Sequence, residues 1–151
     1  MKGNDYMKIL KSLIIWVCFI PAAILNGGLR EYVLVPVIGQ KWALPASGII
    51  LSGLIFLITW LMFPRLIKDS IRTERWLTGI VWALLTVIFE FVAGLSGGNS
   101  IQELFAAYNP LTGNLWLLVM VITLFAPVME SSMRRRRLLH RERSRQVQSN
   151  L

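Results

Sequence analysis

The chain has 151 residues, 55% of them hydrophobic, and a formal net charge of +8. A soluble domain of this length could not hide so much apolar surface from water, whereas lipid can solvate it, so the composition predicts an integral membrane protein. The basic residues lie between or beyond the hydrophobic runs rather than in a folded basic domain, which disfavours nucleic acid as a partner. The single Cys18 excludes an internal disulfide, and the single His140 cannot form a metal site alone, so no metal or cofactor is expected.

The first apolar run covers residues 9–25 and follows a basic start. Such a start also suits a signal peptide, but Pro21 and the lack of a clean small-residue cleavage site disfavour cleavage. The following residues, 26–41, are largely apolar, and one straight helix through most of them would exceed the roughly 30 Å of a hydrocarbon core. We therefore expect a break at Gly27-Gly28, followed by an apolar re-entrant or interfacial segment.

Three further apolar runs are each long enough to cross a membrane, for which about 20 residues suffice. The second run has no charge, the third has only Glu90, and Asn109-Pro110 makes a suitable start for the fourth. The sequence thus predicts an all-α, four-helix transmembrane bundle in one domain (residues 1–133), followed by a basic cytoplasmic tail (residues 134–151). The expected helices cover residues 9–25, 42–63, 76–95 and 110–133.

The distribution of Lys and Arg predicts the orientation. Of the 16 basic residues, 14 lie in the N-terminal segment, the 64–75 loop and the tail, whereas the other two connections hold only Arg30 and Lys41. Cytoplasmic loops carry the excess of Lys and Arg in membrane proteins. We therefore expect both termini in the cytoplasm.

A short amphipathic helix is expected before the fourth span, on the outer surface. Ser100 and Glu103 have the spacing of a capping box, and apolar residues follow at helical spacing. These residues are Ile101, Leu104, Phe105 and Tyr108.

Small residues mark the faces that we expect in the bundle core, because they let helix backbones approach closely. On the third span this stripe contains Glu90 and leaves Trp82 outside it: Gly79, Ala83, Thr86, Glu90 and Gly94. A comparable stripe on the second span is Gly48, Ser52, Ile55 and Thr59.

Glu90 is the most informative residue, because it lies about 7.5 Å below the outer end of its helix, where a carboxylate is costly and needs a partner. Arg30 is the natural partner on that side, since Arg holds carboxylates bidentately. One interpretation is a structural clamp, and the other is a binding or proton site open to the outside. Asn26, Glu31 and Tyr108 would complete either, so the candidate polar site is Asn26, Arg30, Glu31, Glu90 and Tyr108.

The basic residues from Arg134 to Arg145 favour contact with anionic lipid headgroups, which attract polybasic segments next to a membrane span. No Gly-rich phosphate loop, intramembrane histidine or paired intramembrane carboxylate is present, so an enzyme is not expected. Two hypotheses remain: a non-enzymatic accessory or structural protein, and a small transporter or channel component with a Glu90/Arg30 site near the outer face. Four helices enclose little lumen, so transport would need a homo-oligomer.

The run Asn26-Gly27-Gly28-Leu29-Arg30-Glu31, with Pro36, Gly39, Glu90-Phe91 and Gly94, resembles a group of small bacterial four-helix inner-membrane proteins. The resemblance covers nearly the whole chain. It implies a bacterial inner-membrane location and selects Arg30, Glu31 and Glu90 for testing. The group has no established activity, so the resemblance implies no substrate.

Overall fold

The computed structural model of the chain describes residues 3–67, 70–106, 109 and 115–149, and within these residues the regular elements are all helices. Large apolar side chains such as Leu25, Val37 and Leu84 are exposed on the outside, as side chains that face lipid would be. The prediction of an all-α protein with four potential membrane spans is confirmed. The spans are Tyr6–Ile38, Gln40–Leu66, Arg72–Ser96 and Trp116–Gln146.

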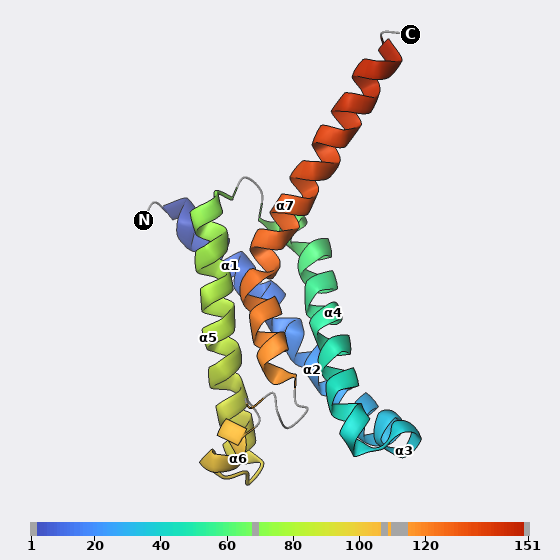
Figure 1. The fold of residues 1–151 in the computed structure, drawn as a ribbon. Coiled ribbons are helices and arrows are strands. Elements are labelled where there is room, and N and C mark those ends of the chain that lie inside the picture. Colours follow the sequence, from blue (N-terminus) through green and yellow to red (C-terminus); the bar gives the residue numbers. More distant parts are fainter. Residues whose placement is uncertain (1–2, 68–69, 107–108, 110–114, 150–151) are drawn as a thin grey trace.

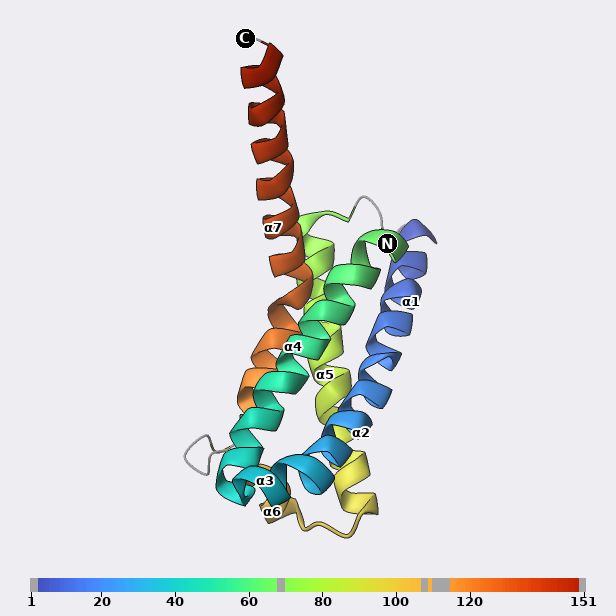
Figure 2. The ribbon, with the colours of Figure 1, turned by 90° about the vertical axis from the view of Figure 1, so that its right-hand side faces the viewer.

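The first span contains four consecutive helical elements. Helix α1 (Gly3–Val17) and helix α2 (Phe19–Leu29) are separated at Cys18. The interruption occurs there because Pro21, three residues later, has no N–H to donate to the carbonyl oxygen one turn earlier. A π-helical segment, η1 (Arg30–Leu34), and the short α3 (Val35–Ile38) follow directly. Figure 2 shows the chain curving through η1 and α3 across one end of the bundle.

The predicted break at Gly27-Gly28 is wrong, because both residues lie within α2. A glycine costs a helix only about 1 kcal/mol relative to alanine, whereas an unpaired backbone group in an apolar medium costs several kcal/mol. The helix therefore continues through the glycine pair. The chain reverses instead at Gly39, whose φ of 78° lies in the left-handed region that favours glycine.

The other three spans are α4 (Gln40–Leu66), α5 (Arg72–Ser96) and the first half of α7 (Trp116–Ser149). Helix α7 packs against both α4 and α5, and α1 and α2 complete the bundle (Figures 1 and 2). The start of α1, the end of α4 and the start of α5 lie at one end of the bundle, from which α7 projects; we call this the basic end. The turn after α3 and the short α6 (Ile101–Ala106) lie at the opposite end.

Trp82 lies at the centre of the core and is fully buried. Its ring makes edge-to-face contacts with Phe19 and Phe63, at centroid distances of 5.2 and 6.1 Å. Its indole Nε1 donates to the carbonyl oxygen of Ser12 over 3.1 Å, which satisfies the one polar atom of the ring. Trp82 thus lies in the core even though it is not part of the small-residue stripe.

Part of each predicted small-residue face is buried in the core. On α4, Ser52, Ile55 and Thr59 are buried, and the two hydroxyls donate to backbone carbonyls one turn earlier in the same helix. On α5, Gly79 lies so close to the backbone of Leu124 that a Cβ atom there would overlap the carbonyl oxygen. Glycine at this position thus permits the close approach of α5 and α7.

Helix α7 continues without interruption from the bundle into the basic segment that was predicted as a tail. Residues 110–114, the predicted start of the fourth span, lie outside the described residues. From Arg134 to Ser149 the helix projects beyond the bundle as a single exposed element (Figures 1 and 2), which we call the arm. At about 1.5 Å per residue, the arm is about 24 Å long.

The predicted capping box of α6 is confirmed. The Ser100 N–H and hydroxyl donate to Glu103 Oε2 over 2.7 and 2.9 Å, and the Glu103 N–H donates back to the Ser100 hydroxyl over 3.3 Å. These hydrogen bonds to the charged form hold the pKa of the Glu103 carboxyl below its usual value. Leu104 is buried against Gly94 of α5, whereas Ile101 and Phe105 are exposed. The placement of α6 on a membrane surface stays a prediction.

Candidate functional site

The predicted polar site at the end opposite the basic end is only partly assembled. Asn26 is buried, and its Nδ2 donates to the carbonyl oxygen of Ser47 over 3.1 Å, which fixes α2 to α4. Its Oδ1 has no hydrogen-bond partner within the described residues. Tyr108, which was expected to complete the site, lies outside the described residues.

Arg30 pairs with its neighbour Glu31 rather than with Glu90. The Arg30 Nε and Nη2 atoms each lie 3.1 Å from Glu31 Oε1, and both side chains are substantially exposed. No ion pair joins Arg30 to Glu90 in the part of the chain that the structure describes. The expected direct pair is thus replaced by a local contact on η1.

Glu90 lines a small apolar cavity between α1, α2, α4, α5 and α7. Trp16 bridges two of these helices, because its Nε1 donates to the hydroxyl of Thr86 over 3.0 Å. Aromatic side chains form much of the wall: Trp16, Phe19, Phe89 and Trp116. The cavity volume of about 40 Å³ has room for roughly one to three water molecules, and not for a larger solute.

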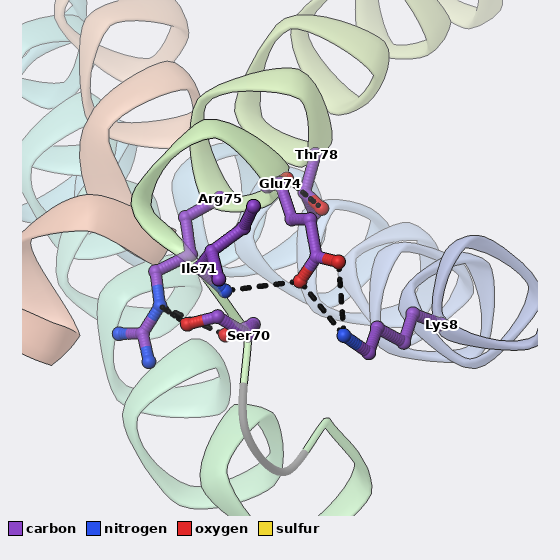
Figure 3. A network of polar contacts seen from close by, with 6 residues as sticks. All are labelled: Lys8, Ser70, Ile71, Glu74, Arg75 and Thr78. Carbon is purple, nitrogen blue, oxygen red and sulfur yellow. Dashed lines mark hydrogen bonds and ion pairs between the residues drawn. The ribbon is translucent and has the colours of Figure 1, made fainter. Parts of the chain in front are cut away.

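Ion pairs between different helices lie at the basic end, where they join α1, α5 and α7. Lys8 Nζ lies 2.9 Å from both carboxylate oxygens of Glu74, linking α1 to the first turn of α5 (Figure 3). Glu74 also accepts the Ile71 N–H over 3.0 Å, and so caps α5. One carboxylate thereby fixes both the start of α5 and its position against α1.

Arg75, the next residue, points to the other side of α5. Its Nε donates to the Ser70 hydroxyl and carbonyl oxygens over 2.8 and 3.2 Å (Figure 3), and its Nη1 lies 3.3 Å from Glu130 Oε2 on α7. The guanidinium also lies 5.7 Å from the ring centroid of Phe63 on α4. Arg75 therefore joins α5, α7 and α4 at the level where the arm begins.

The sequence analysis did not select Glu130 as a candidate site residue. In the structure its side chain is only 4% exposed and holds the junction between the bundle and the arm. Glu130 lies at helical spacing from the other buried residues of α7, and this spacing was the available signal. A charge in phase with a buried face must find a partner. The other buried residues of that face are Val119, Thr123, Ala126 and Pro127.

A groove with arginine and apolar side chains in its lining lies beside this junction, between the end of α4 and the arm. The Arg137 guanidinium carbon lies 4.8 Å from the ring centroid of Trp60, a cation–π contact that joins the arm to α4. The groove has a volume of about 320 Å³. It is lined by Trp60, Pro64, Glu130, Arg134, Arg137 and Arg141.

These features define a helical protein with four potential membrane spans, ion pairs at one end, and a basic arm that continues one span. Within the described residues, no three His, Cys, Asp or Glu side chains lie together as metal ligands would. Comparison with protein-family models, with curated proteins and with solved structures gives no match to this chain. The resemblance to small bacterial four-helix inner-membrane proteins therefore stays a prediction.

Proposed function

We propose that this chain is a non-enzymatic accessory protein of the bacterial inner membrane, whose four spans hold a basic helical arm at the cytoplasmic surface. The observation that carries the proposal is the continuity of α7, whose first half is packed in the bundle and whose second half is the exposed arm. A rigid basic helix at a fixed position suits recruitment or ordering of anionic molecules at the membrane surface.

Contacts at the junction support this proposal. The buried Arg75–Glu130 pair fixes α7 to α5, and the Arg137–Trp60 contact fixes the first turns of the arm to α4. A flexible tail would need neither contact to attract anionic lipid, whereas an arm with a defined direction needs both. The cytoplasmic placement rests on the excess of Lys and Arg at the basic end.

Cysteine labelling tests the orientation. In a Cys18→Ala background, Ser144→Cys places a thiol on the exposed arm and Asn99→Cys places one in the exposed turn after α5. With a membrane-impermeant maleimide, we expect Asn99→Cys to react in intact cells and Ser144→Cys to react only after permeabilisation. The reverse pattern would place the arm outside the cytoplasm and refute the proposal.

Spin labels test whether the arm has a fixed direction. In the same Cys18→Ala background, Ser144→Cys and Leu84→Cys, on the exposed face of α5, would be labelled together in lipid nanodiscs. We expect one narrow distance distribution, which broadens when Glu130→Ala removes the contact with Arg75. A broad distribution in the parent protein would show a flexible tail and contradict the proposal.

A second candidate function is a small transporter or channel component, favoured by the position of Glu90 in a cavity that several helices share. Because the cavity holds only a few waters, this function requires an opening motion or a lumen formed in a homo-oligomer. Proton flux into liposomes containing the purified protein would support it if the flux were lost in Glu90→Gln. Equal flux in the parent and the variant would exclude a role for this carboxylate in transport.

A further inference from the structure

We propose that the groove between the end of α4 and the arm binds the headgroup of an anionic phospholipid, with Arg134, Arg137 and Arg141 holding its phosphate. The inference deepens the proposed function, because it names the ligand class and the site on the arm. It rests on the geometry of the groove and on its level relative to the apolar part of α4.

The three arginines share one face of the helix. They are separated by three and four residues, the spacing that places side chains above one another on an α-helix. All three line the groove. Arginine presents a planar fork of donors that fits phosphate oxygens bidentately, so this face is suited to a phosphate rather than to a single charge of any shape.

Trp60 orders the Arg137 side chain before a ligand binds. The Arg137 guanidinium lies over the indole ring, at 4.8 Å from the ring centroid. A side chain that is already ordered loses less conformational entropy when it binds a ligand. The indole and Pro64 also give the groove an apolar wall against which the glycerol and upper acyl carbons of a lipid can lie.

The negative charge in the groove is already neutralised. Glu130 lines it, but the Glu130 carboxylate lies 3.3 Å from Arg75, which approaches from the α5 side. The three arginines of the arm therefore meet no unpaired carboxylate among the residues that line the groove.

The sequence of α4 indicates that the groove lies near the level of the lipid phosphates. The charge-free stretch of α4 ends at Phe63, and Pro64 and Arg65 follow, so the groove begins where the hydrocarbon core must end. Its volume of about 320 Å³ is sufficient for a phosphate-bearing headgroup. A phospholipid reaches this position from the bilayer, whereas a soluble phosphate has no apolar part to bury there.

Native mass spectrometry of the full chain in detergent can test the site, with phosphatidylglycerol as probe and phosphatidylcholine as the neutral comparison. Arg134→Gln/Arg141→Gln removes two groove charges and leaves the Arg137–Trp60 contact. The matched control is Arg135→Gln/Arg143→Gln, which removes the same charge from exposed positions outside the groove. We expect phosphatidylglycerol to bind about tenfold more weakly to the groove variant and within about twofold of the parent to the control.

Equal weakening in the two variants would overturn the proposal, because it would show attraction by total charge. Equal binding of the two lipids by the parent would also overturn it. Displacement of phosphatidylglycerol by millimolar inorganic phosphate would show a soluble phosphate site in place of a lipid site. If the groove variant does not fold, Arg134→Lys/Arg141→Lys replaces it, because lysine keeps the charge but lacks the planar guanidinium that binds phosphate through two donors. This variant must weaken phosphatidylglycerol binding more than the control Arg135→Lys/Arg143→Lys does.

Binding in detergent is independent of orientation in the cell. Labelling of Ser144→Cys from outside would therefore refute the proposed function and leave the lipid site standing. Failure of the lipid assay with the expected labelling pattern would refute the site alone.

Discussion

The Arg75–Glu130 pair is predicted to be strongly coupled, and its two halves are predicted to differ in cost. Arg75→Gln leaves the Glu130 carboxylate, which is 4% exposed, without its ion-pair partner. Breaking a buried pair in this way costs about 3 kcal/mol or more of the free energy of unfolding. Glu130→Gln is milder, at about 1.5 kcal/mol, because Arg75 is 18% exposed and keeps its contacts with Ser70 and Phe63.

The measurement is a double-mutant cycle on the free energy of unfolding in lipid bicelles. The double variant should be no less stable than Arg75→Gln alone, which gives a coupling energy of about 1.5 kcal/mol. The matched control is the same cycle on Arg30 and Glu31, whose side chains are 36% and 60% exposed. Exposed pairs contribute about 0–1 kcal/mol, so this cycle should give the smaller coupling.

Two results would refute the reasoning. A coupling between Arg75 and Glu130 no larger than that between Arg30 and Glu31 would show that burial does not strengthen the pair. A larger cost for Glu130→Gln than for Arg75→Gln would show that the buried carboxylate is not the group that most needs its partner.

Three further predictions concern other parts of the bundle. Gly79→Ala should lower the free energy of unfolding by about 1–3 kcal/mol, because the added methyl group would meet the backbone of α7. The control is Gly53→Ala, where the added methyl group has open space and should not lower it. Thermal unfolding compares the two variants. Trp82→Phe should cost about 2 kcal/mol in the same assay, through loss of a buried hydrogen bond and of core volume. Carbon-13 titration of the Glu103 carboxyl should give a midpoint below the usual pKa of 4.5, and Ser100→Ala should return that pKa towards its usual value. Because the pKa of Glu103 is depressed in the folded protein, the cap stabilises α6 fully when the pH is above the usual pKa, and this contribution is lost as the pH falls through the depressed pKa. A titration midpoint that Ser100→Ala does not change would contradict this account.

The sequence predicted those elements whose cause is local. Spans are visible because about 20 consecutive apolar residues have few alternatives to a membrane helix. The α6 cap was predictable from Ser100 and Glu103 because a capping box needs only two residues at fixed spacing. The predicted helix break at Gly27-Gly28 was wrong because it rested on the low helix propensity of glycine. It neglected the larger free-energy cost of leaving backbone hydrogen-bonding groups unpaired in an apolar medium.

The partners of polar side chains were not predictable, because they depend on how the helices are aligned against each other. Arg30 was assigned to Glu90 by elimination, since it was the only basic residue other than Lys41 on that side, whereas the structure gives it Glu31. The assignment of Glu130 to Arg75 requires the relative heights of α5 and α7, which no single-helix pattern contains. Trp82 lies off the small-residue stripe and yet at the centre of the core, because lipid-facing and core-facing positions are equally apolar and residue size alone does not distinguish them.

The two ends of the bundle are stabilised in different ways, and this difference bears on both candidate functions. At the basic end, Lys8–Glu74 and Arg75–Glu130 join different helices, so separation of the spans there would break ion pairs. At the opposite end the Arg30–Glu31 pair lies within one helix and would survive such a separation. A separation of the spans at that end would break the Asn26–Ser47 hydrogen bond between α2 and α4, but no interhelical ion pair among the described residues. Under the proposed functions, the Arg75–Glu130 pair that holds the start of the arm, together with Lys8–Glu74, would oppose an opening at the basic end.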